Sequence, residues 1–288
     1  MNKEIWTVGR ILQWTEQYFR SKEMDSPRLD GEVLLSHILG KDRIYLYTHY
    51  DQPLVQEELD AFRPLVQERA KGRSVASIIG EKDFMGLTFK VNEHVLIPRP
   101  DTETLVEYVL DTLPKDFSGR ILDVCSGPGT ILLSLLHYLP QASGMGLELS
   151  IQALQVAEQN RNQLQLAERS IFKHSDMFKA IEHSGESFDV IVSNPPYITS
   201  ADMRILAPEV LAEPHMALEG GADGLDFYRI LVANSGQYLV PGGILAMEIG
   251  IHQGDDVRQL LEATGQFHEI QYCKDLAGIN RVIVAKRM

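Results

Sequence analysis

Cysteine, basic charge and long apolar runs are all scarce in this 288-residue sequence. It has only two cysteines, Cys125 and Cys273, and they lack the paired spacing of a zinc site. Neither a disulfide framework nor a cysteine-rich metal centre is therefore expected. The nine histidines are scattered and include no HExxH pair. We expect no bound metal. The low cysteine content fits a protein that resides in a reducing compartment.

Acidic residues outnumber basic ones, 40 against 27, which gives a formal net charge of −13. This charge disfavours sequence-independent binding to DNA or RNA backbones, although a local basic patch would be compatible with it. No apolar run approaches the length of a membrane span, and the N-terminal residues lack the apolar core of a signal peptide. We expect a soluble, cytoplasmic protein that binds no membrane.

In the first part of the chain, apolar residues recur at helical spacing. Ser26-Pro27 is typical of a helix start and Gly40 of its end, and further helices fit residues 42–48 and 55–69. We predict a small all-helical domain over residues 1–82, which would serve for docking or as a stabilising appendage. A DNA-binding helix-turn-helix ranks third, because no helix rich in Arg and Lys is present.

Residues 83–98 are expected to link this domain to the next. Apolar residues alternate along them until Asn92-Glu93, and the apolar run 95–97 follows. This pattern predicts a β-hairpin. Pro98 and Pro100 close it, and the next helix is expected to begin near Asp101.

From Arg120 onward, short apolar strands alternate with amphipathic helices. This order predicts an α/β domain with a mainly parallel sheet and helices on both faces, which we assign to residues 99–288. The last two strands, near 268–273 and 281–286, are joined by a short loop instead of a helix. We expect them to form an antiparallel hairpin at the sheet edge.

Polar residues occur at four successive strand ends, where open α/β sheets bind their ligands. These residues are Asp123, Glu148, Asp176 and Asn194. Because the carboxyl ends of parallel strands meet at one edge of a sheet, we expect the four side chains to share a site. This coincidence is the strongest argument for a ligand in the sequence.

The loop after the first of these strands contains Gly127 and Gly129, which leave room for a ligand to approach the backbone. The spacing does not match a dinucleotide fingerprint, so a plain tight turn is the alternative. Glu148 can accept hydrogen bonds from both hydroxyls of a ribose, and Asp176 with Met177 can hold an adenine ring. Acidic and neutral acceptors without a lysine cluster suit a cationic cofactor such as S-adenosylmethionine.

The strand near residues 188–192 ends in Ser193-Asn194-Pro195-Pro196-Tyr197. A stiff turn is the simplest interpretation of Asn-Pro. Chemically, the Asn194 side-chain oxygen and the Pro195 carbonyl can each accept one N–H of a planar NH₂ group and so aim its nitrogen. The prolines fix the backbone, and Tyr197 can pack on the flat group. This favours methyl transfer to an amide or aromatic amine.

Six segments of the sequence together resemble the bacterial peptide chain release factor glutamine methyltransferases, of the protein-(glutamine-N5) methyltransferase family. They are residues 95–107, 121–130, 188–198, 209–231, 248–254 and 274–285. The resemblance implies a Rossmann-like class I methyltransferase fold with a seven-stranded sheet. It implies methylation of N5 of the glutamine in the Gly-Gly-Gln motif of class I release factors. It also implies S-adenosylmethionine as cofactor with S-adenosylhomocysteine as product, and an N-terminal domain that helps dock the release factor. We expect a monomer.

The resemblance also suggests individual roles for residues. Asn194, Pro195, Pro196 and Tyr197 are expected to bind and orient the substrate glutamine. Cys125 stands where the family usually has glycine, and Glu148 where it usually has aspartate. The residues expected to bind the cofactor are Asp123, Cys125, Ser126, Gly127, Pro128, Gly129, Glu148, Leu149, Asp176, Met177 and Asn194.

Four further charged or polar residues have more than one interpretation. Arg99 could orient the substrate or pair with a carboxylate, and pairing is preferred. Glu103 could equally line the pocket or cap its helix. Glu248 and Gln253 fit the family pattern but are interpreted as structural hydrogen-bonding residues.

Two other functions remain open from the sequence. A DNA or RNA methyltransferase acting on adenine or guanine amino groups would share residues 194–197, but would need a basic groove. A non-catalytic or NAD-binding Rossmann-type protein is the other alternative. Both the glycine spacing and residues 194–197 argue against it.

Overall fold

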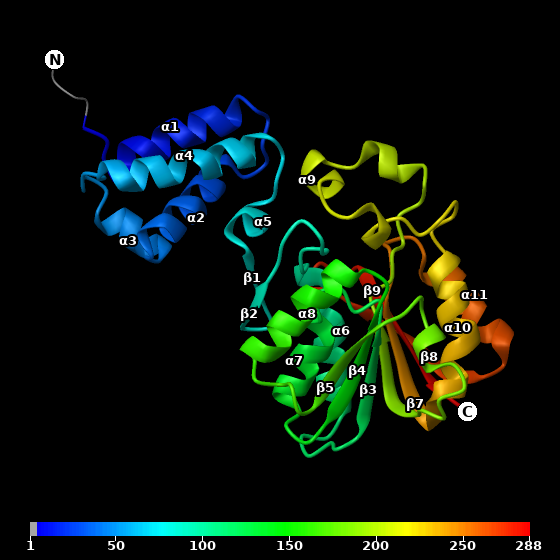
Figure 1. Ribbon diagram of the computed structural model, residues 1–288. Coiled ribbons are helices and arrows are strands. Elements are labelled where there is room, and N and C mark those ends of the chain that lie inside the picture. Colours follow the sequence, from blue (N-terminus) through cyan, green and yellow to red (C-terminus); the bar gives the residue numbers. More distant parts are fainter. Residues whose placement is uncertain (1–4) are drawn as a thin grey trace. The chain divides into compact units, whose positions relative to one another are not determined.

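The computed structural model describes residues 5–288, and the chain divides into two compact units (Figure 1). The helical unit comprises Met1–Gly80 with Pro208–Ala212, and the sheet unit comprises Glu81–Ala207 with Glu213–Met288. Each unit has a hydrophobic core of its own.

The helical unit is built from short amphipathic helices around a core that includes Leu12, Phe19 and Phe62. The predicted helix stop is confirmed, because Gly40 has φ of 60° at the end of its helix, a conformation that favours glycine. Ser26 precedes that helix but makes no side-chain capping bond. The helices are α1 (Val8–Arg20), α2 (Pro27–Leu39), α3 (Arg43–Thr48), α4 (Gln56–Ala70), α5 (Val75–Ile79) and the short α9 (Pro208–Leu211).

A buried ion pair explains why residues 208–212 belong with these helices. Arg69 Nε on α4 donates to Asp30 Oδ2 on α2 at 2.7 Å, and Arg69 Nη2 donates to Glu209 Oε2 on α9 at 2.9 Å. The Arg69 side chain is only 7% exposed. One guanidinium therefore joins three helices that are distant in sequence.

The sheet unit begins with an antiparallel hairpin of β1 (Glu81–Phe84) and β2 (Leu87–Lys90). Its turn is Met85-Gly86, with φ of 51° and 71°, as two-residue hairpin turns prefer. A hairpin was predicted over residues 83–98, with the alternating pattern interrupted at Asn92-Glu93. The position of that interruption was wrong, because the hairpin turns at residues 85–86 and residues 95–97 form no strand. The Asn92 side chain instead accepts the backbone N–H of His94, which makes a local turn that competes with strand pairing.

The central sheet has seven strands in the order β5-β4-β3-β6-β7-β9-β8. Pairs among β3 to β7 are parallel, and β9 pairs antiparallel with both β7 and β8. The predicted parallel sheet with an antiparallel hairpin at its edge is thus confirmed. The strands are β3 (Arg120–Val124), β4 (Ser143–Glu148), β5 (Ser170–His174), β6 (Phe188–Ser193), β7 (Leu239–Glu248), β8 (Phe267–Lys274) and β9 (Asn280–Arg287).

Helices cover both faces of this sheet (Figure 1). One face packs on α6 (Pro100–Thr112), α7 (Thr130–Tyr138) and α8 (Ile151–Gln163), whose buried residues form one core with β-strand side chains. The other face packs on α10 (Asp226–Tyr238) and α11 (Gly254–Thr264). Three 3₁₀ turns, η1 (Lys179–Ile181), η2 (Asp202–Ile205) and η3 (His215–Ala217), lie in the connecting loops.

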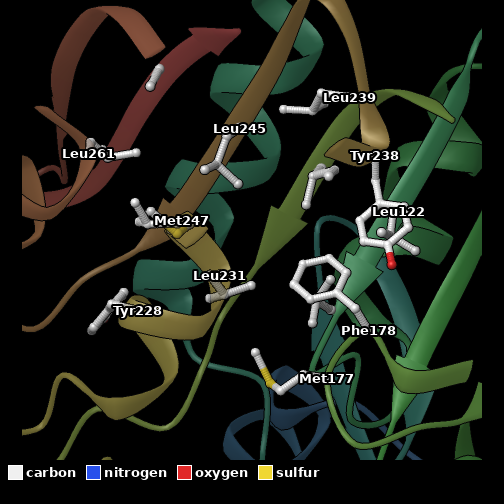
Figure 2. Close-up of a cluster of buried hydrophobic side chains, with 14 of the residues drawn as sticks. Leu122, Met177, Phe178, Tyr228, Leu231, Tyr238, Leu239, Leu245, Met247 and Leu261 are labelled. Atoms are coloured by element: carbon white, nitrogen blue, oxygen red, sulfur yellow. The ribbon is translucent and has the colours of Figure 1, made fainter. Parts of the chain in front are cut away.

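The hydrophobic core between the sheet and helices α10 and α11 anchors the loop that follows β5. Figure 2 shows the Phe178 ring beside the Tyr238 ring and Leu122 of β3, with Met177 on the other side of Phe178, and Leu245 of β7 belongs to the same cluster. The Phe178 and Tyr238 rings stack with centroids 5.1 Å apart. This packing fixes the position of Met177 at the carboxyl edge of the sheet.

The order in which strands are added to the sheet changes direction between β3 and β6, which are parallel neighbours. Strands β3, β4 and β5 run outward in order on one side, and β6 and β7 on the other. Such a switch point leaves a crevice beyond the carboxyl ends of the two central strands.

Candidate functional site

An open pocket lies beyond the carboxyl ends of β3 to β6, and all of its lining residues belong to the sheet unit. It encloses about 970 Å³ of space between atoms, a figure that includes open solvent at its mouth. The sequence-predicted residues that line it are Arg99, Cys125, Ser126, Gly127, Pro128, Glu148, Leu149, Asp176, Met177, Asn194 and Pro196.

The loop after β3 turns sharply into α7. Gly127 and Gly129 both have positive φ, 52° and 80°. A Cβ at Gly127 would meet nothing within 4 Å, so glycine is needed there for backbone conformation alone. A Cβ at Gly129 would come within 2.7 Å of Phe172, so that glycine also permits close packing. Gly129 itself does not line the pocket but shapes the turn that does.

Cys125 and Met177 are two non-glycine residues in the left-handed conformation at the pocket wall, with φ of 63° and 50°. Their sulfur atoms lie 3.7 Å apart. Burial raises the pKa of the Cys125 thiol well above its usual value, with Glu148 and Asp123 adding to the effect. The thiol is therefore neutral at physiological pH, which argues against a nucleophilic role.

Glu148 ends β4 and holds the backbone on both sides of the pocket. Its Oε2 accepts the N–H of Gly127 and its Oε1 that of Ser150, each at 2.8 Å. Burial raises the pKa of Glu148 although these backbone donors oppose the shift. Each carboxylate oxygen retains acceptor capacity beyond one bond, so Glu148 can still bind ligand hydroxyls.

Asp123 differs from the expectation that all four strand-end residues share one site. It is fully buried behind the loop, does not line the pocket, and accepts the N–H of Leu132 in α7 at 3.3 Å. Its other oxygen has no partner among the residues that the structure describes. Burial raises the pKa of Asp123 to about 8. Its side chain supports the turn from beneath instead of facing a ligand.

Asp176 and Met177 follow β5 and do reach the pocket. Asp176 forms an ion pair with Lys179 at 2.5 Å, which leaves its second oxygen as an acceptor. The backbone carbonyl of Met177 accepts the hydroxyl of Ser175 at 2.6 Å, which holds the left-handed turn in place.

Asn194 lines the pocket at the end of β6, with its amide tied to a buried polar group. Asn194 Nδ2 donates to Thr102 Oγ1 on α6 at 3.2 Å, and Thr102 donates to Glu248 Oε2 at 2.5 Å. Tyr197 OH donates to Glu248 Oε1 at 3.3 Å. Pro196 lines the pocket, whereas Pro195 and Tyr197 do not. The Tyr197 side chain therefore packs behind the loop, not on the pocket wall.

The Gln253 side chain holds the loop at residues 194–197 by bonding to the backbone of that loop. Its Nε2 donates to the carbonyls of Tyr197 and Gly224, at 3.0 and 3.1 Å, and its Oε1 accepts the N–H of Gly250 at 3.1 Å. The structural role predicted for Gln253 is confirmed, and it bears directly on the loop at 194–197.

The two charged residues near the start of α6 have distinct partners. Arg99 Nη2 donates to Glu213 Oε1 at 2.5 Å, and Glu213 Oε2 also accepts the N–H of Ile97, so the preferred pairing role is confirmed. Glu103 neither lines the pocket nor caps its helix. It accepts the N–H of Met85 at 2.6 Å, because the hairpin turn presents that donor to it.

The structural hydrogen-bonding role predicted for Glu248 is confirmed, whereas Thr102 was not predicted from the sequence. Glu248 ends β7 at the same edge as Glu148 and Asn194, so the strand-end argument could have included it. Thr102 carried no sequence signal for this role, because its partners Asn194 and Glu248 lie 92 and 146 positions further along the chain.

Residues 5–288 contain neither a metal-binding cluster nor a membrane-spanning helix. No group of three or more His, Cys, Asp or Glu side chains there is placed to hold a metal ion. No helix in this part of the chain is long and apolar enough to cross a membrane.

Two family models match the chain. Residues 10–80 match the PrmC N-terminal domain, and residues 101–223 match the methyltransferase small domain. Among solved structures, a methyltransferase from Pyrococcus furiosus aligns with a TM-score of 0.51 at 15% identity, covering 76% of this chain and 98% of that one. This likeness shows that the fold is that of a methyltransferase.

Curated relatives match over almost the whole length. The release factor glutamine methyltransferase of Geobacter sulfurreducens is 43% identical over 281 residues, covering 97% of this chain and 96% of the relative. That of Rhodopirellula baltica is 38% identical over 287 residues, covering 98% and 97%. On this full-length similarity, the chain belongs to the family of release factor glutamine methyltransferases.

Proposed function

We propose that this protein transfers a methyl group from S-adenosylmethionine to N5 of the glutamine in the Gly-Gly-Gln motif of class I peptide chain release factors. The observation that carries the proposal is the position of Asn194. It lines the same pocket as the loop after β3 and the carboxylate of Glu148, at the switch point of the sheet. A site for a nucleoside and a site for a planar amide are thus adjacent.

The residues at the pocket fit S-adenosylmethionine. Glu148 offers carboxylate oxygens for ribose hydroxyls, and Met177 and Leu149 offer apolar contacts for adenine beside the acceptor Asp176. The lining contains no lysine among the described residues, as suits a cationic sulfonium better than a pyrophosphate. When bound, the cofactor supplies an electrophilic methyl group.

Asn194 and Pro195 orient the acceptor nitrogen. The lone pair of an amide nitrogen is delocalised, so the reaction depends on position and on electrostatic support for developing positive charge. The Asn194 Oδ1 at the pocket wall can accept one N–H of the glutamine side chain, and we assign the second N–H to the Pro195 carbonyl from the family resemblance, since Pro195 itself does not line the pocket. The prolines fix φ at both positions, so the carbonyl is held without rearrangement. Proton loss after transfer then needs no dedicated base.

The finer assignments rest on the same proposal. The helical unit would help dock the release factor, with its exposed Trp14 and Leu29 available for contact. The protein would act as a monomer on a protein substrate in the cytoplasm, where translation takes place. Sequence-specific nucleic-acid binding is not part of the proposal.

Intact-mass analysis of an unmethylated release factor tests the reaction. Incubation with the protein and S-adenosylmethionine should add one methyl group that maps to the Gly-Gly-Gln peptide. An adenine-containing oligonucleotide in a parallel reaction should remain unmodified. Methylation of the oligonucleotide instead of the release factor would show a nucleic-acid amino methyltransferase.

A further inference from the structure

A chain of hydrogen bonds runs from the pocket into the core of the sheet unit. It begins at Asn194 Nδ2, passes through Thr102 Oγ1 and ends at Glu248 Oε2, over distances of 3.2 and 2.5 Å. Thr102, which also lines the pocket, is 5% exposed and Glu248 is 2% exposed, so both groups are largely shielded from water. Such a buried polar chain is expected to have a defined direction.

The chemistry of the groups sets that direction. An ionised carboxylate can only accept hydrogen bonds, so the Thr102 hydroxyl must use its single proton toward Glu248. The Thr102 oxygen can then only accept from Asn194. The Asn194 amide must therefore turn its NH₂ toward Thr102, which leaves Oδ1 free as an acceptor.

We infer that Glu248, acting through Thr102, is a positioning residue that fixes the Asn194 amide so that Oδ1 faces the substrate NH₂ group. This inference rests on the proposed function, and it extends that function to two residues that act through the Asn194 amide. In the opposite orientation Asn194 would present a donor to a donor, and the substrate amide would be repelled.

Glu248 also holds the other end of the residue 194–197 loop. Its Oε1 accepts the Tyr197 hydroxyl, and its backbone carbonyl accepts the Tyr228 hydroxyl at 2.9 Å. One carboxylate thus contacts both Tyr197 and, through Thr102, Asn194. The loop is held at both ends by a single buried group.

The surroundings of Glu248 make this arrangement sensitive to pH. Burial raises the pKa of Glu248 to about 7, Thr102 and Tyr197 oppose the shift, Asp101 on α6 adds to it, and Arg281 on β9 opposes it. Arg281 is itself paired with Asp101 and Asp275, at 2.9 and 2.8 Å, so its charge is partly offset. A protonated Glu248 can donate to Thr102, which would release the Thr102 proton toward Asn194 and permit the inverted orientation.

The test compares Thr102→Val with Thr102→Ser, because valine keeps the shape and removes the hydroxyl, whereas serine keeps the hydroxyl. Methylation of the release factor should lose about 10- to 100-fold in kcat in Thr102→Val, with binding of S-adenosylmethionine by calorimetry unchanged. Thr102→Ser should retain most of the activity. Thr15→Val is the matched control, because Thr15 is fully buried and its hydroxyl has no partner among the described residues.

A pH profile of kcat supplies a second readout that a purely structural role would not move. The unaltered protein should lose kcat as the pH falls through about 7, and Glu248→Gln should remove this dependence. Normal kcat in Thr102→Val, while the unaltered protein methylates the release factor, would overturn the inference and leave the proposed function intact. An unaltered protein that transfers no methyl group would overturn the proposed function and the inference with it. Should Glu248→Gln fail to fold, Thr102→Val alone decides.

Discussion

Glu148 Oε2 accepts the backbone N–H of Gly127 at 2.8 Å, which ties the loop after β3 to the end of β4. The same carboxylate accepts the N–H of Ser150 at the start of α8. The shape of the pocket therefore depends on a side chain that is also expected to contact the ribose. Loss of Glu148 removes both contributions together.

Glu148→Ala is expected to weaken S-adenosylmethionine binding by more than about tenfold, because hydrogen bonds to a charged group contribute about 1.5 to 3 kcal/mol each. Glu148→Asp should give an intermediate loss, since the shorter side chain cannot reach Gly127 and a ribose equally well. Calorimetric titration with the cofactor measures both. Glu107→Ala, an exposed change on α6, is the control, and equal affinity in Glu148→Ala and Glu107→Ala would refute the assignment.

Asn194→Ala is expected to abolish methyl transfer while cofactor affinity stays within about threefold, because the amide orients the acceptor nitrogen. Single-turnover kinetics with the release factor, alongside cofactor titration, separates the two effects. Asn162→Ala on the exposed surface of α8 should behave like the unaltered protein. Near-normal turnover in Asn194→Ala would exclude the orienting role.

Cys125→Ala should have a lower free energy of unfolding than Cys125→Gly, by about 1 kcal/mol, because the φ of 63° at this position favours glycine. Both changes remove the sulfur contact with Met177, so the comparison isolates the backbone effect. The free energy of unfolding from urea titration of the two variants gives the difference. If alanine proves the more stable, the left-handed backbone at Cys125 is not a source of strain.

The buried Asp123 carboxyl should make the free energy of unfolding fall as the pH rises. Its folded-state pKa of about 8 lies above the unfolded value, so the folded state retains a proton that the unfolded state has lost between pH 4 and 8, roughly. The slope should approach about 1.4 kcal/mol per pH unit. Urea unfolding followed by circular dichroism at several pH values should show a smaller slope in Asp123→Asn. Asp116→Asn, an exposed change, should leave the slope unaltered, and equal slopes in all three proteins would contradict the buried neutral carboxyl.

Arg69→Ala should destabilise the helical unit by about 3 kcal/mol, because it leaves the Asp30 carboxylate buried without its partner. Both tryptophans, Trp6 and Trp14, lie in this unit, so fluorescence during urea unfolding follows it alone. Arg20→Ala removes an exposed pair with Glu16, and should cost less than about 0.5 kcal/mol. Similar midpoints for the two variants would mean that the buried pair adds no stability.

The sequence allowed the sheet, the helical unit and most of the pocket to be predicted, because each depends on local patterns. Apolar runs mark buried strands, and strand ends mark one edge of the sheet. Glu148 and Asn194 were found in this way, whereas Cys125 was named from the family resemblance. The depth of a strand-end side chain is not local, which is why Asp123 was expected at the pocket although α7 covers it. The bonds among Thr102, Asn194 and Glu248 join residues distant in sequence, and no spacing rule signals them.

Gln253 satisfies three backbone groups, those of Tyr197, Gly224 and Gly250, with one side chain. Three segments that are distant in sequence are therefore joined by one side chain when the chain folds. The conformational entropy of ordering them is lost at that stage and not when a substrate arrives. The affinity of the site for a flexible peptide is thereby partly determined by a glutamine that lies outside the pocket lining.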